Sequence, residues 1–139
     1  PWQGTWWGVQ DAGVNWSGDH IRNLETVTFT QNDDKPITVD HKVQQGSREV
    51  PGSLTGTGRI DAGRLVITPK NGGKELALSY SAVSRSMDTP FTNADKSTVT
   101  LKALAPENNE EMESIRSEIV QISQKPENKI DTTLSKAKS

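Results

Sequence analysis

The sequence predicts a mainly β protein: an antiparallel meander that forms a small barrel or a barrel-like sandwich, followed by one C-terminal amphipathic α-helix and a polar tail. Two observations support this fold class. Over residues 1–105, short stretches of alternating apolar and polar residues recur between turn-forming residues, which is typical of antiparallel strands. After Pro106 the apolar residues are three and four positions apart, which is typical of a helix.

The chain of 139 residues has the length of about one domain, enough for a modest hydrophobic core. We expect residues 1–105 to form the β-domain, residues 106–124 the amphipathic helix and residues 125–139 a polar, flexible tail. Only 31% of the residues are hydrophobic, so part of the chain is expected to be solvated loop or tail.

All the tryptophans lie near the start of the chain, at positions 2, 6, 7 and 16. Successive side chains of a strand point to opposite faces, so Trp6 and Trp7 in the strand GTWWGV cannot share a face. One indole should enter the core, and the other then needs a covering helix, a partner surface or a ligand. Both packing and a role in a pocket or interface are consistent with this pattern.

The next strands follow a polar loop that carries Trp16. In LETVTFTQ, Val27 and Phe29 share one face while threonines occupy the other. The same alternation in ITVDHKVQ predicts four side chains on one face: Ile37, Val39, His41 and Val43. We expect NDDKP to form a turn and QQGSREVPG a loop.

Glycines at alternating positions distinguish the following strand, SLTGTGRI. Gly56 and Gly58 fall in phase with Ile60, and their missing side chains permit sharp coiling or the close approach of a backbone or a ligand. The residues DAG at 61–63 fit a hairpin connection, and NGG at 71–73 is a tight-turn signal.

Three more strands are predicted, in RLVITP, KELALSYSAV and STVTLKAL, and the segment DTPFTNAD between the last two is expected to be a loop with Phe91. In KELALSYSAV the side chains in one phase are those of Leu76, Leu78, Tyr80 and Ala82. About seven strands joined mostly by short hairpins predict an up-and-down barrel or a sandwich.

The predicted helix carries one apolar stripe, made of Met112, Ile115, Ile119 and Ile122. Glutamates near its start complement the helix dipole, and Lys125-Pro126 should end it. Two interpretations of the stripe stay open. It packs the helix against an edge or the mouth of the β-domain, or it is a face that docks a partner.

Composition excludes several classes of function. The net charge of −2 and the pI near 5.7 give no basis for nucleic-acid binding, and the absence of cysteine excludes disulfides and thiolate sites. No stretch is apolar enough for a membrane-spanning helix. Because the chain begins at Pro1 and not at Met, we expect a processed protein of the periplasm or the extracellular space, or an outer-membrane lipoprotein after signal removal.

No residue pattern predicts catalysis. His20 and His41 each follow an aspartate, but Asp40 and His41 would face opposite sides of a strand. No serine lies in a nucleophile elbow, and two histidines without zinc-site spacing do not predict a metal site. TGTGRI lacks the helix that a phosphate loop needs. We therefore expect no enzyme, cofactor or metal, with His20 exposed in a loop and His41 partly buried.

Two short motifs resemble a known family. Gly4-Thr5-Trp6 is similar to the G-x-W element that opens the first strand of lipocalin-like and avidin-like calycin barrels, and the segment LTGTG at 54–58 resembles an avidin strand. The resemblance implies a barrel closed at one end by Trp6. Avidin-type pockets also use tryptophans from later strands, and none follows Trp16 here, which argues against biotin binding.

Two hypotheses for function follow. The first is an extracytoplasmic binding protein that holds a small apolar or lipid-like ligand in the barrel mouth, lined by Trp6, Trp7, Trp16 and Tyr80, with space left at inward Gly56, Gly58 and Ala82. The alternative is a protein-interaction module, such as an envelope lipoprotein domain, an inhibitor or an assembly subunit. It would use the tryptophan-rich end and the helix stripe against a partner. The sequence leaves the oligomeric state open.

Overall fold

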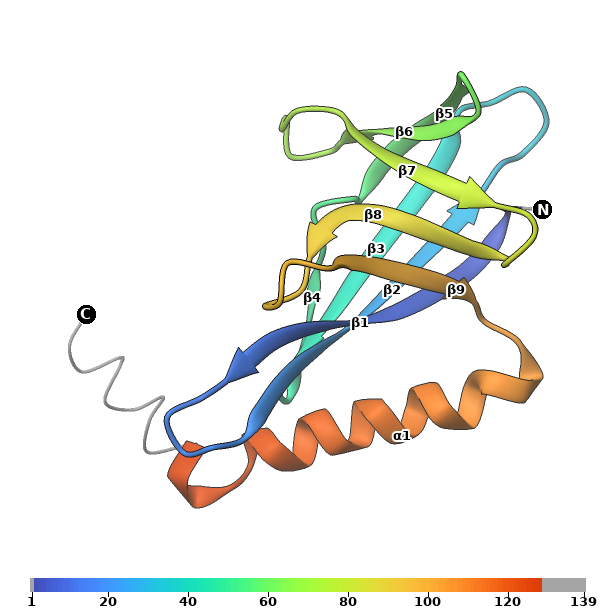
Figure 1. Cartoon of the computed structure of the whole chain (residues 1–139). Helices are drawn as coiled ribbons and strands as arrows, with labels where there is room; N and C mark the ends of the chain where they lie inside the picture. Colours follow the sequence, from blue (N-terminus) through green and yellow to red (C-terminus); the bar gives the residue numbers. More distant parts are fainter. Residues whose placement is uncertain (1, 129–139) are drawn as a thin grey trace.

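The computed structural model describes residues 2–128 and shows a closed antiparallel β-barrel with one long helix along its side (Figure 1). The strands are β1 (Gly4–Val14), β2 (His20–Thr30), β3 (Ile37–Gln45), β4 (Arg48–Pro51), β5 (Gly56–Asp61), β6 (Arg64–Pro69), β7 (Leu76–Ser81), β8 (Ser86–Thr92) and β9 (Thr98–Ala103). Helix α1 (Pro106–Ser123) follows β9. Residues 129–139 of the tail predicted at 125–139 lie outside the described residues.

The barrel is an up-and-down ring of eight strands that pair in the order β1, β2, β3, β5, β6, β7, β8 and β9. The pairing of β1 with β9 closes the ring. Strand β4 pairs only with β3 and is not a member of the ring. It lies along the same edge of β3 as β5, but it pairs with a later part of β3. The structure thus decides between the two predicted architectures in favour of the barrel.

Two segments expected to be loops are strands, β4 within QQGSREVPG and β8 at the start of DTPFTNAD. Their sequences are polar and contain proline, so local propensity conceals them. In β8 a register shift between Asp88 and Thr92 accommodates Pro90, which has no N–H to donate. Here Thr89 Oγ1 donates to the carbonyl of Val99 at 2.8 Å and so joins β8 to β9 by its side chain.

The inner face of the barrel is filled by apolar side chains, chiefly those of Trp6, Val27, Phe29, Ile37, Val39, Leu54, Leu65, Ile67, Leu78, Met87 and Leu101. This confirms the predicted inward phases of the second and third strands. A Cβ on Gly58 would lie 3.2 Å from Ile67 Cδ1 and 3.4 Å from Val39 Cγ2, so neighbouring side chains occupy the space that this glycine leaves.

Two residues predicted to point inward are exposed instead. Ile60 lies beside the tight β5–β6 turn, where Ala62 and Gly63 adopt positive φ angles of 51° and 77°. Ala82 lies in the turn between β7 and β8. In both cases the alternation holds along the strand but fails at the hairpin tip, because the chain there no longer has a barrel interior to face.

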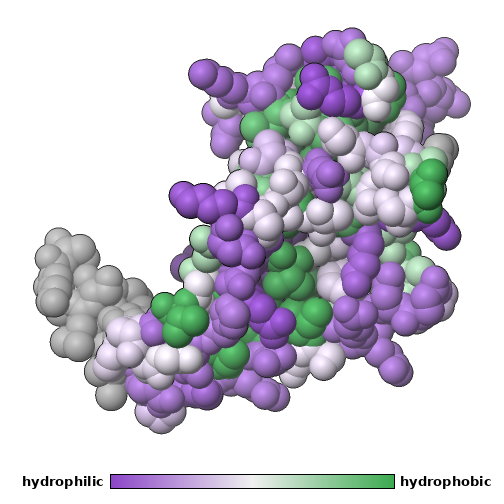
Figure 2. Space-filling model, viewed as in Figure 1, coloured by the Kyte–Doolittle hydropathy of each residue, from purple (hydrophilic) through white to green (hydrophobic). Residues whose placement is uncertain are grey.

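The outer face of β1 and β2 is covered by α1 (Figure 1). Trp7 and Leu24 pack there against Met112 and Ile119, while Ile115 is partly buried in the same cluster. Figure 2 shows an apolar patch near the middle of this face, between the strands and α1, with polar surface around it. No helix among the described residues is both long and apolar enough to cross a membrane.

Candidate functional site

The residues predicted to line one aromatic site are distributed over three places. Trp6 is buried in the barrel core, where its Nε1–H donates to the carbonyl of Trp2 at 2.7 Å. Its ring lies perpendicular to that of Tyr80, with the ring centroids 5.7 Å apart. Trp7 is buried on the opposite face of the same strand, and Trp16 lies 64% exposed in the β1–β2 connection. The structure therefore brings together only Trp6 and Tyr80 of these four, as packing residues.

Trp7 is held under α1 by polar contacts as well as by packing. Its Nε1–H donates to Asn108 Oδ1 at 3.2 Å, and the same oxygen accepts the N–H of Ala105 at 3.0 Å at the helix start. Lys102 Nζ lies 4.4 Å from the centre of the Trp7 ring, a cation–π contact. The second indole thus meets a covering helix, one of the three environments expected for it.

The helix stripe predicted as a partner face points toward the barrel. Met112 and Ile119 are buried, and Ile115 and Ile122 are partly buried. An apolar stripe next to an apolar patch on β1 and β2 is more stable when it covers that patch than when it meets water. Met112, Ile115 and Ile119 therefore form no exposed docking face in this structure, whereas Ile122 borders a hollow beside the helix end.

A different cluster, which the sequence analysis did not predict, lies inside the barrel at the end opposite to Trp2. Glu25 of β2 and His41 of β3 both point inward, and Glu25 Oε1 lies 2.6 Å from His41 Nε2. Glu25 is 5% exposed and His41 2% exposed. Two ionisable groups are therefore buried together in a wall that is otherwise mostly apolar.

The hydrogen bonds of His41 determine where its proton lies. The backbone N–H of Leu54 donates to His41 Nδ1 at 3.1 Å, so Nδ1 carries a lone pair and no proton. A neutral imidazole then has its proton on Nε2, which donates to Glu25. Both nitrogens are occupied, which leaves no lone pair for a general base or a metal ion. No cluster of metal-binding side chains occurs elsewhere in residues 2–128 either.

The imidazole is enclosed by two further groups. The ring of Phe91 stacks on His41 with centroids 6.1 Å apart and planes 20° apart. Gly52 donates its N–H to the carbonyl of His41 at 2.8 Å, and a Cβ on Gly52 would lie only 2.1 Å from His41 Nδ1. The close approach of the segment around Gly52 to the ring therefore requires glycine.

This pair borders an open hollow at the barrel end, which we call the mouth pocket. Its volume is about 230 Å³, and the groups that give it chemical character are Gln10, Glu25, His41, Val43, Ser53 and Phe91. The amide of Gln10 is held in place, since its Nε2–H donates to the carbonyl of Thr92 and its Oε1 accepts from Asn23. The lining thus combines amide, carboxyl and imidazole groups with an apolar wall.

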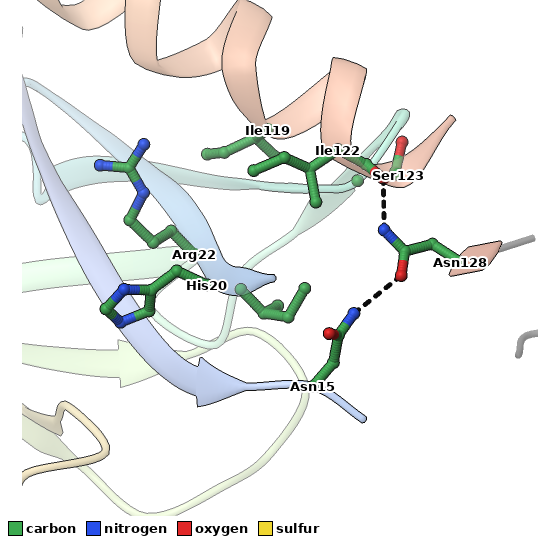
Figure 3. A pocket seen from close by; sticks show the side chains of 9 residues that line it. Asn15, His20, Arg22, Ile119, Ile122, Ser123 and Asn128 are labelled. Carbon is green, nitrogen blue, oxygen red and sulfur yellow. Dashed lines mark hydrogen bonds between the residues drawn. The ribbon is translucent and has the colours of Figure 1, made fainter. Parts of the chain in front are cut away.

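A second hollow of about 240 Å³ lies outside the barrel, between the β1–β2 connection and the end of α1 (Figure 3). Ile119 and Ile122 reach into it from the helix. Asn128 spans its far side, because its Oδ1 accepts from Asn15 Nδ2 at 2.8 Å and its Nδ2 donates to the carbonyl of Ile122 at 2.6 Å. We call it the hairpin–helix pocket.

Ionic contacts tie the β1–β2 connection to the end of the helix beside this second pocket. Lys125 Nζ lies 2.7 Å from Asp19 Oδ1, and its hydrogen bond, together with one from Asn128, holds the pKa of Asp19 below its ordinary value. Nearby, His20 contacts Asp11, whose pKa is lowered mainly by a hydrogen bond from the backbone N–H of Gly13. His20 is exposed, as predicted, but it begins β2 and does not lie in a loop.

Of the residues that line the mouth pocket, the sequence pattern predicted the inward positions of His41 and Val43 alone. Glu25 alternates in phase with Val27 and Phe29, so the strand pattern was also sufficient to predict that this carboxylate points into the barrel. The contribution of Gly52 and Leu54 had no such signal, because it depends on where the chain returns after β4.

Comparisons with known proteins return nothing for this chain: no family model, no curated protein and no solved structure matches it.

Proposed function

We propose that this chain is a non-enzymatic binding protein that holds a small molecule in the mouth pocket of its barrel. The observation that carries the proposal is the buried Glu25–His41 pair at the wall of an open hollow. Burying ionisable groups costs free energy, and apolar residues at the same positions would give a more stable barrel. Convergent polar groups in an otherwise apolar concavity are typical of ligand sites.

The size of the pocket limits its ligand. Pockets that bind drug-sized molecules span roughly 300–1,000 Å³, and the mouth pocket has about 230 Å³. Deeper in the barrel, Phe29, Leu78 and Met87 are fully buried in the packed core. The ligand that suits this space is a compact amphipathic molecule, which narrows the apolar or lipid-like ligand expected from the sequence.

The state of His41 supports binding over catalysis. Its two nitrogens are used by Leu54 and Glu25, so the ring positions its neighbours and has no site for a substrate proton. The pair instead presents a fixed polar surface to whatever enters the pocket.

A fragment screen by nuclear magnetic resonance on the isotope-labelled chain tests this proposal. Compounds of up to about fifteen heavy atoms are expected to shift the amide signals of Gly52 and Leu54 saturably, because these amides contact His41. Ser53→Trp, which adds bulk to an exposed residue of the pocket rim, should abolish those shifts without unfolding the barrel. Compounds that shift only signals around the hairpin–helix pocket, or none at all, would contradict the proposal.

A specific surface feature favours protein interaction as a second candidate function. Val14 and Trp16 are 65% and 64% exposed in the segment that borders the hairpin–helix pocket. Large exposed apolar side chains beside a hollow are typical of interaction surfaces. A partner captured by cross-linking should be lost with Trp16→Ser and kept with Val83→Ser, since Val83 is 99% exposed at a different hairpin. Equal loss in both variants would argue against this surface.

The extracytoplasmic location, as a periplasmic, secreted or lipid-anchored protein, stays part of the proposal. Cell fractionation of the native protein tests it, and recovery in the cytoplasm would refute it.

A further inference from the structure

We propose that the mouth pocket selects ligands with a cationic N–H donor, such as a primary ammonium or an amidinium group, and that Glu25 is the residue that binds this group. The inference rests on the proposed binding function and specifies the chemistry of the ligand. It depends on the second oxygen of Glu25.

Glu25 uses only one of its two carboxyl oxygens within the described protein. Oε1 accepts the Nε2–H of His41, while Oε2 has no hydrogen-bond partner among residues 2–128. No side-chain oxygen or nitrogen in that part of the chain is both sealed from solvent and unpartnered. Oε2 therefore keeps contact with solvent although the side chain is only 7% exposed, and we infer that it does so through the mouth pocket, which Glu25 lines.

The charges around this oxygen favour a cation. The neutral His41 ring donates a hydrogen bond from its Nε2–H to Glu25 and brings no positive charge. No lysine or arginine lines the described part of the pocket, and Glu25 is its only carboxylate. Burying a carboxylate without a counter-charge costs free energy, and a cationic group on the ligand would provide that counter-charge. An anionic ligand would meet repulsion at the same position.

The remaining lining suits the rest of such a ligand. Val43 and Phe91 provide an apolar wall that an alkyl or aryl body can contact. Gln10 and Ser53 add neutral polar groups, which can accept the further N–H groups of an ammonium ion. The pocket therefore matches a small amine with an apolar body.

Three compounds with the same ring and different charge provide the test: benzylammonium, benzyl alcohol and benzoate. Each is titrated at neutral pH into the full isotope-labelled chain, and the Leu54 amide and the His41 ring nitrogens are followed. We expect benzylammonium to bind at least about tenfold more tightly than benzyl alcohol, because a charge-assisted hydrogen bond is the stronger one, and benzoate to leave these signals unchanged.

Two variants test whether Glu25 causes the preference for a cationic ligand. Glu25→Gln keeps an oxygen for the Nε2–H of His41 and removes the charge, so benzylammonium should bind this variant no better than benzyl alcohol. Glu110→Gln makes the same charge change on the exposed part of α1 and should leave all affinities unchanged. The three compounds on the unaltered chain test the charge preference even if Glu25→Gln fails to fold.

The outcomes separate the inference from the proposed function. Binding of benzyl alcohol or benzoate in the mouth pocket as tightly as benzylammonium overturns the inference and leaves the binding function standing. A fragment screen that finds ligands in this pocket but no amine among them also overturns the inference and leaves the binding function standing. No hit of any kind in the pocket overturns both.

Discussion

The imidazole of His41 is surrounded by groups from three separate segments of the chain: β2, β8 and the β4–β5 connection. Glu25 accepts a hydrogen bond from its Nε2–H, and the N–H of Leu54 donates to its other nitrogen. Phe91 stacks on the ring and Gly52 lies against it. Each contact depends on the others, because a tilt of the ring would break both hydrogen bonds at once. The geometry of the mouth pocket is therefore sensitive to single atoms added near this ring.

Gly52→Ala is expected to lower the free energy of unfolding by about 1–3 kcal/mol, the usual cost of forcing an extra methyl group into a packed site. The added Cβ would lie 2.1 Å from His41 Nδ1, so the ring or the segment must move. Urea unfolding measures the loss, and the ring nitrogen signals of His41 should shift. Gly73→Ala, where the nearest atom is 3.2 Å away on the side chain of Asn71, is the control and should change stability by less than about 0.5 kcal/mol. Unchanged stability and unchanged His41 signals in Gly52→Ala would contradict the described packing.

Helix α1 is attached to the barrel by a buried apolar cluster with polar contacts at both ends. At its start Asn108 accepts from Trp7, and at its end Lys125 pairs with Asp19. Ion pairs of this exposed kind contribute little to overall stability. The Lys125–Asp19 pair instead fixes where the helix end lies, and this end forms one wall of the hairpin–helix pocket.

The attachment of the helix end is expected to weaken in acid. Hydrogen bonds from Lys125 and Asn128 lower the pKa of Asp19 below its ordinary value of 3.8. Its stabilising contribution is therefore complete above about pH 4 and is lost as the pH falls through the lower folded-state value. The pKa of Lys125 is raised from 10.5 by the same pair, so its contribution is complete below that pH and is lost only in strong alkali.

Hydrogen exchange along α1, corrected for the intrinsic pH dependence of exchange, measures this effect. Amides of the last turn should lose protection below about pH 4, before those around Met112 do. In Asp19→Asn, the last turn of α1 should be less protected already at pH 7, and acid should cause no further loss through residue 19. A last turn that stays protected in acid to the same degree as the helix start would refute the prediction.

The whole molecule depends on one non-local pairing. Strands β1 and β9 are the first and last of the ring, and their contact converts an open meander into a closed barrel. Gly8 lies at this seam, where a Cβ would be 2.4 Å from the carbonyl oxygen of Thr100. The obstacle is backbone, which cannot rotate away as a side chain can, so closure at this point requires glycine.

Gly8→Ala is accordingly expected to destabilise the protein by about 2–3 kcal/mol, near the upper part of the range for overpacking. The loss should appear in urea unfolding of the entire chain, together with weaker hydrogen-exchange protection in β1 and β9 than in β5 and β6. Gly73→Ala again serves as the control. Loss of protection spread evenly over all strands would show that the seam is not the site of the damage.

Local periodicity was sufficient to predict several elements and the faces of their residues. Alternation predicted the inward phases of Val27, Phe29 and His41, and the three-and-four spacing predicted the helix and its apolar stripe. These predictions succeeded because each depends on residues a few positions apart. The same signals failed for β8, whose polar residues and Pro90 conceal a strand that neighbouring strands hold in place.

Features that depend on residues far apart in the chain became visible in the folded barrel alone. Barrel closure requires β1 to meet β9, and the cover over Trp7 requires α1 to fold back on β1 and β2. The candidate site likewise joins Glu25, His41 and the N–H of Leu54, which no local pattern relates to one another. Hydrogen bonds and burial are properties of neighbours in space, so a strand pattern can show that His41 points inward but not which groups meet it there.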